Sequence, residues 1–312
     1  MINAFKRHGA IKSAKAILPK NKRSSNHLTR RKIKKMDCWP EWEKSEHKQL
    51  DQYHSQQMFG EPCQLPAGAN VLDLLWAYLV KTDSTKKARC VCNGQPTFKG
   101  TVVFGHTFAK MLDQVGSRIF WGTVAAKNLI VSGADASNAF AEANAPDIPL
   151  FVRVDNQYRE WYKLRFNKDI PNNYVLLVQK ALQGHPESSR LWALHMDKIL
   201  KTKFNLKPTT HEGCLYQGVY QNEEILFLRQ VDDFAVASKH ESTATSLIND
   251  IDSHMTIQIK DLGLLTKYNS VDIIQSKYYI KISNETYIDK LLKEHNWLLD
   301  DDKISNILLP TK

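Results

Sequence analysis

Two neighbouring carboxylates, Asp232 and Asp233, stand between two apolar runs, and no other feature constrains the fold of this chain more tightly. The segment reads Ile225-Leu-Phe-Leu-Arg-Gln-Val-Asp-Asp-Phe-Ala-Val-Ala237. Apolar runs on both sides of a short polar break predict two half-buried strands joined by a tight turn. The pattern therefore predicts a β-hairpin that carries both carboxylates at its tip and presses against a core.

A third carboxylate, Asp135, ends another strand-like apolar run that begins at Asn128, and a helix is expected from Ser137. Two adjacent negative charges repel each other, so one pKa must rise unless a positive charge lies between them. Hard oxygen ligands suit magnesium. Three carboxylates fit a two-metal site, whose ions lie roughly 3.5–4 Å apart and clamp the oxygens of a phosphoryl transfer.

Plainer explanations fit each carboxylate taken singly. Aspartate tolerates turn geometry, so the pair at 232–233 also fits ordinary turn chemistry. Asp135 also fits the role of a cap for the helix that follows it. The residues around both sites favour the catalytic interpretation.

Residues 230–233, Gln-Val-Asp-Asp, are similar to the Tyr-x-Asp-Asp box of reverse transcriptases. Residues 135–140, Asp-Ala-Ser-Asn-Ala-Phe, resemble the first catalytic box of the Ty1/copia retrotransposon group, Asp-Val-x-x-Ala-Phe. Across about residues 39–310 the chain therefore resembles the RNA-dependent DNA polymerase domain of a Ty1/copia-type Pol polyprotein. Further similar segments follow the family's order: Lys87–Gly94, His106–Ala109, Leu182–Gly184, Arg190–Trp192, Asp261–Gly263, Tyr279–Ser283 and Tyr287–Ile288.

The resemblance implies that Asp135, Asp232 and Asp233 are the catalytic and metal-binding carboxylates, with Asp135 and Asp232 as the direct ligands. It implies two Mg²⁺ ions, with Mn²⁺ as the alternative. The reaction would be attack of a primer 3′-hydroxyl on the α-phosphate of a deoxynucleoside triphosphate (dNTP).

The resemblance also implies a dNTP-binding set of five residues. Phe140 matches the aromatic that excludes a 2′-hydroxyl, although packing in a core also explains a phenylalanine here. Arg89 matches the arginine of the fingers that holds the triphosphate, and a guanidinium fork suits phosphate oxygens. Gln183 and Gly184 match a dipeptide that contacts the nucleotide. Lys81, on the same predicted hairpin as Arg89, is placed to reach phosphate.

Four positions depart from the family pattern. Gln230 replaces the usual tyrosine, and His106 stands where glutamate is common. Ser189 stands for proline and Ser270 for glycine. No carboxylate is lost, but together these changes leave decay from an active element open.

The chain has 312 residues and a formal charge of +10, and residues 1–35 hold twelve Lys or Arg and no acid. All of the excess positive charge therefore lies in this segment. It predicts a disordered basic tail that binds nucleic acid, directs nuclear import or merely links domains. A transit peptide has a similar composition. The resemblance favours a linker between integrase and polymerase.

The remaining composition points to an intracellular protein, cytoplasmic or nuclear. No apolar run reaches the roughly 18 residues that span a bilayer, and no secretory signal is recognisable. Five cysteines at irregular spacing predict reduced thiols rather than a disulfide framework. Cys90 and Cys92 are expected on one face of a strand.

Periodicity predicts interleaved helices and strands, with loops over 144–173 around one strand. Apolar residues Met111, Leu112, Val115, Ile119 and Phe120 are expected to form the core face of the helix over 109–127. His195 is expected to be a satisfied core histidine. The predicted helices are 39–53, 109–127, 188–204, 242–254 and 284–297, and the predicted strands are 71–78, 88–92, 150–154, 175–178, 266–274 and 277–283.

We expect an α+β fold with an antiparallel palm sheet backed by helices, a fingers region and a short or truncated thumb. The expected division is a basic tail over 1–36, fingers and palm over 37–283, and the start of a thumb or connection over 284–312. Expected partners are an RNA or DNA template–primer, dNTPs and the integrase and ribonuclease H regions of the same polyprotein. An inactive remnant that binds nucleic acid is the first alternative, and another two-metal enzyme such as a nuclease is the second.

Overall fold

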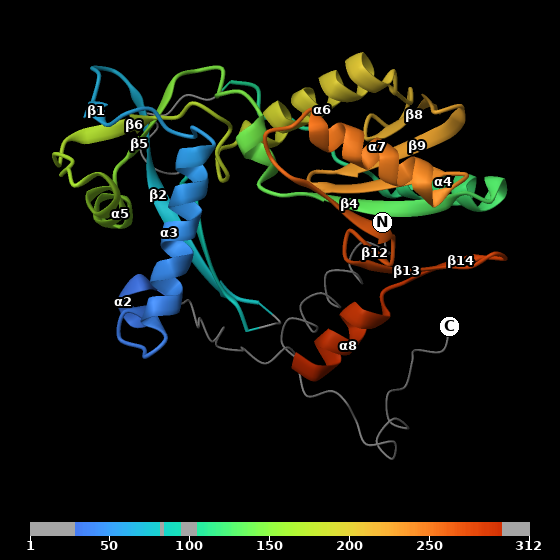
Figure 1. Cartoon of the computed structure of the whole chain (residues 1–312), viewed down its shortest axis with the longest axis horizontal. Coiled ribbons are helices and arrows are strands. Elements are labelled where there is room, and N and C mark those ends of the chain that lie inside the picture. Colours follow the sequence, from blue (N-terminus) through green and yellow to red (C-terminus); the bar gives the residue numbers. More distant parts are fainter. Residues whose placement is uncertain (1–28, 82–83, 95–104, 295–312) are drawn as a thin grey trace, which may run out of the picture. The chain divides into compact units, whose positions relative to one another are not determined.

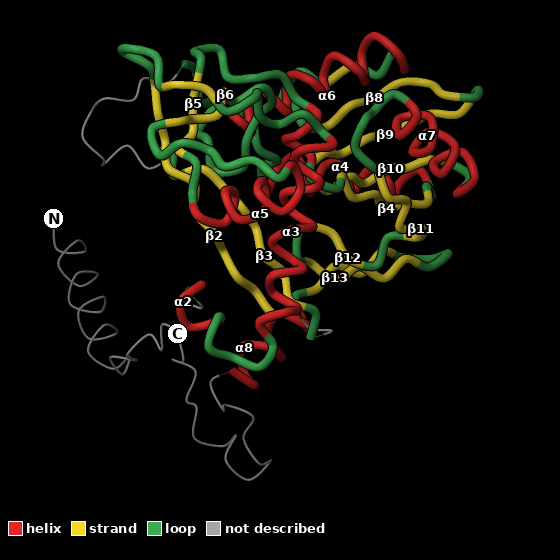
Figure 2. Tube along the Cα trace, turned by 60° about the vertical axis from the view of Figure 1, so that its left-hand side comes forward, coloured by secondary structure: helices red, strands yellow, loops and turns green. Residues whose placement is uncertain are grey.

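The computed structural model describes residues 29–81, 84–94 and 105–294. They belong to two compact units: one comprises residues up to Gln49 together with 76–90, and the other comprises 50–75 and the chain from Val91 onward. Within the described ranges the strands form three sheets, largely antiparallel, interleaved with helices (Figure 2). The predicted mixture of helices with antiparallel sheets is thus confirmed. No helix in these ranges is long and apolar enough to cross a membrane.

The first unit is organised around a buried carboxylate, Glu46. The Arg30 guanidinium donates to it from Nε at 3.0 Å and from Nη2 at 2.9 Å, and the Tyr78 hydroxyl donates at 2.5 Å. Charge pairing and hydrogen bonding together offset the cost of burying this carboxylate. The unit contains α2 (Arg30–Ile33), most of α3 (Trp39–Ser55), the end of β2 (Asn70–Val80) and most of β3 (Lys86–Cys92).

The boundary of the predicted tail is wrong in the part that the structure describes. Residues 30–33 are helical, and the Ile33 side chain among the basic residues is fully buried. An apolar side chain in a basic run favours burial against a neighbouring surface, and the ion pair of Arg30 fixes the same segment. Residues 1–28 of the predicted tail lie outside the described residues.

A six-stranded antiparallel sheet forms the centre of the second unit, in the order β11-β4-β10-β9-β8-β7. The predicted hairpin is its middle pair, and β4 lies between β10 and β11. Its strands are β4 (Ile130–Ala136), β7 (Lys207–Pro208), β8 (Leu215–Tyr220), β9 (Glu223–Gln230), β10 (Asp233–Ser238) and β11 (Ile259–Leu264).

Side chains alternate between the two faces of this sheet along each strand, and both faces are covered. On one face Trp192 of α6 (Ser188–Phe204) stacks on Phe234, with ring centroids 6.5 Å apart. Figure 1 shows α6 and α7 (Glu241–Ser253) along that side. On the other face Leu228 and Ala235 join a core with α4 (Gln114–Lys127). The sheet is therefore held between two apolar layers.

The helix predicted over 109–127 starts later, at Gln114. Asp113 is its N-cap, and the Asp113 carboxylate accepts from the Gly116 backbone N–H at 2.5 Å. A capping aspartate satisfies one of the free N–H groups of the first turn. Apolar residues at helical spacing continue before Asp113, and the sequence analysis therefore placed the start of the helix too early.

The predicted core face of α4 is wrong at three of its five positions, since Phe120 is buried and Leu112 packs against the core. Met111, Val115 and Ile119 are more than half exposed, whereas Phe120 and Val124 are fully buried. Apolar residues occur on two sides of this helix, so periodicity alone does not decide which side meets the sheet. Packing against β8, β9 and β10 selects the side of Phe120 and Val124.

A second sheet has the order β1-β6-β5-β2-β3. β2 pairs in parallel with β5, and β5 pairs antiparallel with β6. The loops predicted over 144–173 contain a helix that the sequence analysis missed: Asp155 caps it by accepting from the Tyr158 N–H at 2.8 Å. These elements are β1 (Cys63–Gln64), β5 (Leu150–Arg153), α5 (Asn156–Phe166) and β6 (Tyr174–Leu177).

The last described elements form a small antiparallel sheet and a helix. The strand predicted over 266–274 is in fact two short strands separated by a turn at Asn269 and Ser270, and the strand predicted over 277–283 begins only at Ile280. The helix predicted over 284–297 is confirmed up to Glu294, and residues 295–297 lie outside the described residues. The elements are β12 (Lys267–Tyr268), β13 (Val271–Gln275), β14 (Ile280–Ser283) and α8 (Glu285–Glu294).

Candidate active site

The two adjacent aspartates in the turn between β9 and β10 differ in their exposure to solvent. Gln230 and Asp233 are opposite each other, so Val231 and Asp232 form a two-residue loop. Asp232 is exposed at the tip, and Asp233 is half-buried at the first position of β10. Val231 adopts φ +54°, an uncommon conformation for a β-branched residue. Its carbonyl accepts from the Trp192 indole N–H at 2.7 Å, which fixes the turn to α6.

Strand β4 brings the third carboxylate to this turn. Asp135 is directly opposite Asp233 in the antiparallel pair, and side chains of such a pair lie on the same face. The next residue, Ala136, donates its N–H to the Asp232 carbonyl at 2.9 Å. Backbone pairing therefore unites two motifs that are about one hundred residues apart in the sequence.

The surroundings of Asp233 shift its protonation equilibrium. Burial raises the pKa of the Asp233 carboxyl, and the negative charges of Asp232 and Asp135 raise it further. Such a cluster favours a bound cation, and carboxylate oxygens are ligands that Mg²⁺ and Mn²⁺ accept. The three residues thus fit a divalent ion chemically. Within the described chain, no three His, Cys, Asp or Glu side chains converge closely enough to ligate one as they stand.

Gln230, which replaces the family's tyrosine, has a definite structural role here. Its side-chain carbonyl accepts from the Leu112 backbone N–H at 3.1 Å. Leu112 packs at the edge of the core under β9 and β10, immediately before the start of α4. The substitution thus links the segment before α4 to the active-site turn.

Gln183 and Gly184 form a tight turn against the end of β3. The Cys92 N–H donates to the Gln183 carbonyl at 2.8 Å. Gly184 has φ +91°, and a Cβ there would lie 2.2 Å from the Cys92 carbonyl oxygen. A Cβ on Gly94 would lie 2.1 Å from the Gly184 carbonyl oxygen. Two glycines are therefore required where these backbones meet, and the sequence analysis gave Gly94 no such role.

Phe140 is half-buried on a short 3-10 helix, η1 (Ala139–Glu142), where a longer helix was predicted. The helix starts only after Asn138, which has a left-handed backbone at φ +58°. The Asn138 side-chain amide donates to Gln56 Oε1 at 2.6 Å. The position of Phe140 after Asp135 thus depends on a turn rather than on helical continuation.

Glu142 is a buried carboxylate that sequence reasoning missed. Its Oε2 accepts from the backbone N–H groups of Thr256 and Ile257 at 2.8 and 3.0 Å. His195 Nε2 lies 3.8 Å from Glu142 Oε1 and has no hydrogen bond within the described residues, so the prediction of a satisfied histidine is wrong. No local sequence signal marks a carboxylate whose partners lie on a loop more than one hundred residues away.

Glu187 is a second buried anchor that was missed. It accepts from the Gly105 N–H at 2.7 Å and from the Asp147 N–H at 3.2 Å. Arg190, in the Arg-Leu-Trp segment, pairs with Asp147 and donates to the His106 carbonyl. These contacts hold the loops that contain Gly105 and Asp147 to the start of α6. The Arg-Leu-Trp segment with Arg190 was a signal in the sequence that pointed to this part of the structure.

Arg89 and Lys81 belong to the first unit. Arg89 is exposed between buried Ala88 and Cys90, as strand alternation requires. Lys81 is exposed just beyond β2, and its N–H donates to the Thr85 carbonyl at 2.9 Å. Their roles in dNTP binding stay predictions.

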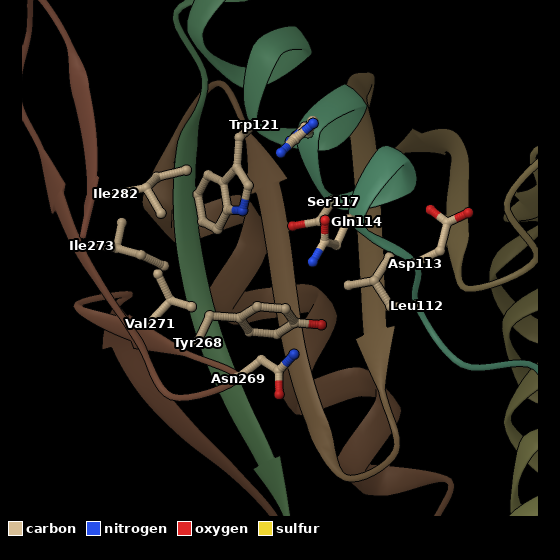
Figure 3. A pocket seen from close by; sticks show the side chains of 11 residues that line it. Leu112, Asp113, Gln114, Ser117, Trp121, Tyr268, Asn269, Val271, Ile273 and Ile282 are labelled. Carbon is tan, nitrogen blue, oxygen red and sulfur yellow. The ribbon is translucent and has the colours of Figure 1, made fainter. Parts of the chain in front are cut away.

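A cavity of about 510 Å³ lies between α4 and the β12–β13 segment (Figure 3). Burial raises the pKa of Tyr268 well above its usual value, and the charge of Asp233 adds to that shift. The Tyr268 hydroxyl is buried without a hydrogen-bond partner among the described residues. The lining residues are Leu112, Asp113, Gln114, Ser117, Arg118, Trp121, Tyr268, Asn269, Val271, Ile273 and Ile282.

Comparison with known families identifies the class of protein. Residues 61–306 match the model of the family described as reverse transcriptase (RNA-dependent DNA polymerase). The match covers well over half of the sequence, and the chain belongs to this family. The resemblance inferred from the Asp135 and Asp232–Asp233 motifs is thereby confirmed. No curated protein matches the chain.

Two solved structures are similar at low sequence identity. One is a foamy viral protease–reverse transcriptase in complex with double-stranded DNA: TM-score 0.43, 14% identity, covering 80% of this chain and 36% of that one. The other is telomerase from Candida albicans with a fragment of telomeric RNA: TM-score 0.43, 9% identity, covering 83% of this chain and 54% of that one. The chain thus spans only about one third to one half of these larger proteins.

Proposed function

We propose that this chain is the reverse transcriptase of a Ty1/copia-type retrotransposon, which extends a primer on an RNA or DNA template with dNTPs. The observation that carries the proposal is the strand register, because it sets Asp135 opposite Asp233 beside the turn of Asp232. Membership of the reverse transcriptase family supports it. In this proposal the six-stranded sheet is the palm, and the β2–β3 hairpin belongs to the fingers.

The three carboxylates have different tasks in the proposed reaction. Asp135 and Asp232 would hold two divalent ions, Mg²⁺ or Mn²⁺, as direct ligands, and Asp233 would support them. Bound there, the ions would promote ionisation of the primer 3′-hydroxyl and neutralise charge on the departing pyrophosphate. Asp135 and Asp233 are fixed by the sheet, whereas Asp232 is exposed in the turn, where an incoming substrate would reach it.

The remaining residues of the proposed site select and hold the nucleotide. Phe140 excludes the ribose 2′-hydroxyl, and the turn of Gln183 and Gly184 contacts the nucleotide. Arg89 and Lys81 bind its phosphates, for which a guanidinium and an ammonium are suited.

Primer extension tests the proposal. With an RNA template, magnesium and labelled dNTPs, the wild-type chain should extend the primer. Asp232→Asn should abolish extension with little change in template–primer binding, because it removes a charge at the reaction centre. Asp169→Asn, at an exposed surface carboxylate, is the control and should extend normally.

Two outcomes contradict the proposal. Normal extension by Asp232→Asn would remove the carboxylate from the mechanism. A folded wild-type chain that binds template–primer without extending it would favour the inactive remnant.

A further inference from the structure

A buried pair joins the segment of Phe140 to the helix that holds the catalytic turn. Glu142 lies two residues after Phe140 on η1, and its Oε1 is 3.8 Å from Nε2 of His195 on α6. The other oxygen of Glu142, Oε2, accepts from the Thr256 hydroxyl at 2.6 Å as well as from two backbone N–H groups. Among the described residues no hydrogen bond reaches Oε1, so this oxygen is available to His195.

His195 is also connected to the catalytic turn. Its ring stacks on Trp192, with centroids 6.0 Å apart and planes 15° from parallel. The Trp192 indole N–H in turn donates to the Val231 carbonyl, next to Asp232. A change at the histidine therefore reaches the turn through one stacked ring and one hydrogen bond.

The gap between His195 and Glu142 depends on the charge of the histidine. At 3.8 Å the two atoms are beyond hydrogen-bond distance, and His195 Nε2 is buried without a partner among the described residues. A neutral imidazole carries a proton on one ring nitrogen, whereas an imidazolium donates from both. Protonated His195 would donate to Glu142 Oε1 at about 2.7–2.9 Å, which shortens the gap by about 1 Å.

Charged groups on three segments act on this histidine: Glu142 on η1, Lys180 after β6, and Lys198 on α6 itself. Burial lowers the pKa of the His195 imidazole, the charge of Glu142 raises it, and the two lysines lower it further. The net result is a pKa below the ordinary histidine value of 6.5. His195 is therefore neutral at neutral pH and takes up a proton only in mildly acidic solution.

We propose that His195 positions Phe140 relative to the catalytic turn and thereby sets the discrimination between dNTPs and ribonucleoside triphosphates (rNTPs). The inference rests on the proposed polymerase function, in which Phe140 excludes the ribose 2′-hydroxyl. When the pair with Glu142 is closed, η1 is tied to α6 and Phe140 cannot retreat from the sugar. When the pair is open, the tie is absent, so the closed pair gives the stricter discrimination.

Incorporation of a single nucleotide at different pH values tests the proposal. The measured quantity is kcat/KM for a dNTP divided by kcat/KM for the matching rNTP, because pH effects on primer and metal ions are common to both substrates. For the wild-type chain this ratio should fall about fivefold between about pH 5.5 and about pH 8, the lower end of typical couplings between two sites.

Variants of the histidine should remove this pH dependence in two different ways. His195→Leu cannot donate to Glu142 and should keep the lower ratio at every pH. His195→Gln offers an amide N–H at every pH and should keep the higher ratio. His240→Gln removes the histidine of an exposed His–Glu pair at the end of β10 away from Asp233, and should retain the wild-type pH dependence.

Nuclear magnetic resonance supplies a measurement that needs no catalysis. The His195 imidazole should titrate with a pKa below 6.5, and with a lower one in Glu142→Gln, because the negative charge that favours the imidazolium is lost. The resonance of the Trp192 indole N–H should shift with the same pKa in the wild-type chain, and should not shift in His195→Leu.

Three results would overturn the role of His195: a wild-type ratio that is constant with pH, a pH dependence that survives in His195→Leu, or a Trp192 resonance that ignores the titration of His195. Equal loss of activity on both sugars, with an unchanged pH dependence of the ratio, would identify a merely structural histidine. Incorporation of neither sugar by the wild-type chain would contradict the polymerase function, and the Trp192 resonance would still decide whether His195 is coupled to the turn.

Discussion

At the scale of single residues, the site combines negative charge with backbone strain. Asp233 is half-buried beside two further carboxylates, and Val231 holds a left-handed backbone in the turn. Both features cost folding free energy in the absence of a ligand. Backbone strain and clustered negative charge at one turn are typical of a site that is completed by what it binds.

Asp233→Asn should raise the thermal midpoint of the ion-free protein at neutral pH. The raised pKa of Asp233 means that the folded chain binds this proton more tightly than the unfolded chain does. The folding free energy that this tighter proton binding contributes is therefore lost as pH rises from the ordinary aspartate pKa of 3.8 through the raised pKa of Asp233. Calorimetry in a chelator measures the effect.

Asp272→Asn is the control with the opposite sign, because the Thr286 backbone N–H lowers the pKa of Asp272. Its ionised form favours the folded state above the ordinary aspartate pKa, so the asparagine variant should melt no higher than wild type. A lower midpoint for Asp233→Asn than for wild type would contradict the electrostatic description of the site.

Gly184→Ala should lower the free energy of unfolding by at least about 2 kcal/mol, because both a positive φ and a backbone clash oppose a side chain there. Gly122→Ala is the control: it lies inside α4 with nothing within 4 Å of its added Cβ, and should stabilise by about 0.5–1 kcal/mol. Denaturant unfolding measures both. Equal effects of the two alanines would show that the Gly184 turn is not required.

At the scale of elements, the catalytic hairpin could be predicted and several helix boundaries could not. Apolar runs around a polar pair defined β9 and β10 because that pattern is local. The start and buried face of α4 depended on a cap and on contacts with a distant sheet. The cap Asp155 and the spacing of Tyr158 and Trp161 were readable signals for α5, but the polar composition of the segment obscured them.

The start of α4 depends on its cap. Asp113→Ala should cost about 1 kcal/mol of stability, because the Gly116 N–H loses its acceptor. Asp113→Asn keeps a capping oxygen and should recover most of that loss. Chemical denaturation of both variants tests this, and an alanine variant as stable as wild type would mean that the neighbouring Glu212 carboxylate, which accepts from the Asp113 N–H at 3.2 Å, suffices.

At the scale of the whole molecule, the order and pairing of the strands create the candidate site. Asp135 and Asp232 are identified by motifs in the sequence, but only the pairing of β4 with β10 makes them neighbours. The anchors Glu142 and Glu187 escaped prediction because they bind backbone groups of remote loops, which leave no local pattern.

The central claim is that two distant motifs form one cation site, and iron-directed backbone cleavage tests it most directly. With hydrogen peroxide and ascorbate added, Fe²⁺ bound in place of Mg²⁺ reduces the peroxide to hydroxide and a hydroxyl radical and becomes Fe³⁺, which ascorbate reduces again, and the radical cuts only the nearby chain. The account predicts cuts near both Asp135 and Asp232, suppressed by excess Mg²⁺ and absent from Asp232→Asn. Cleavage near only one of the two motifs, or cleavage that Mg²⁺ does not suppress, would contradict it.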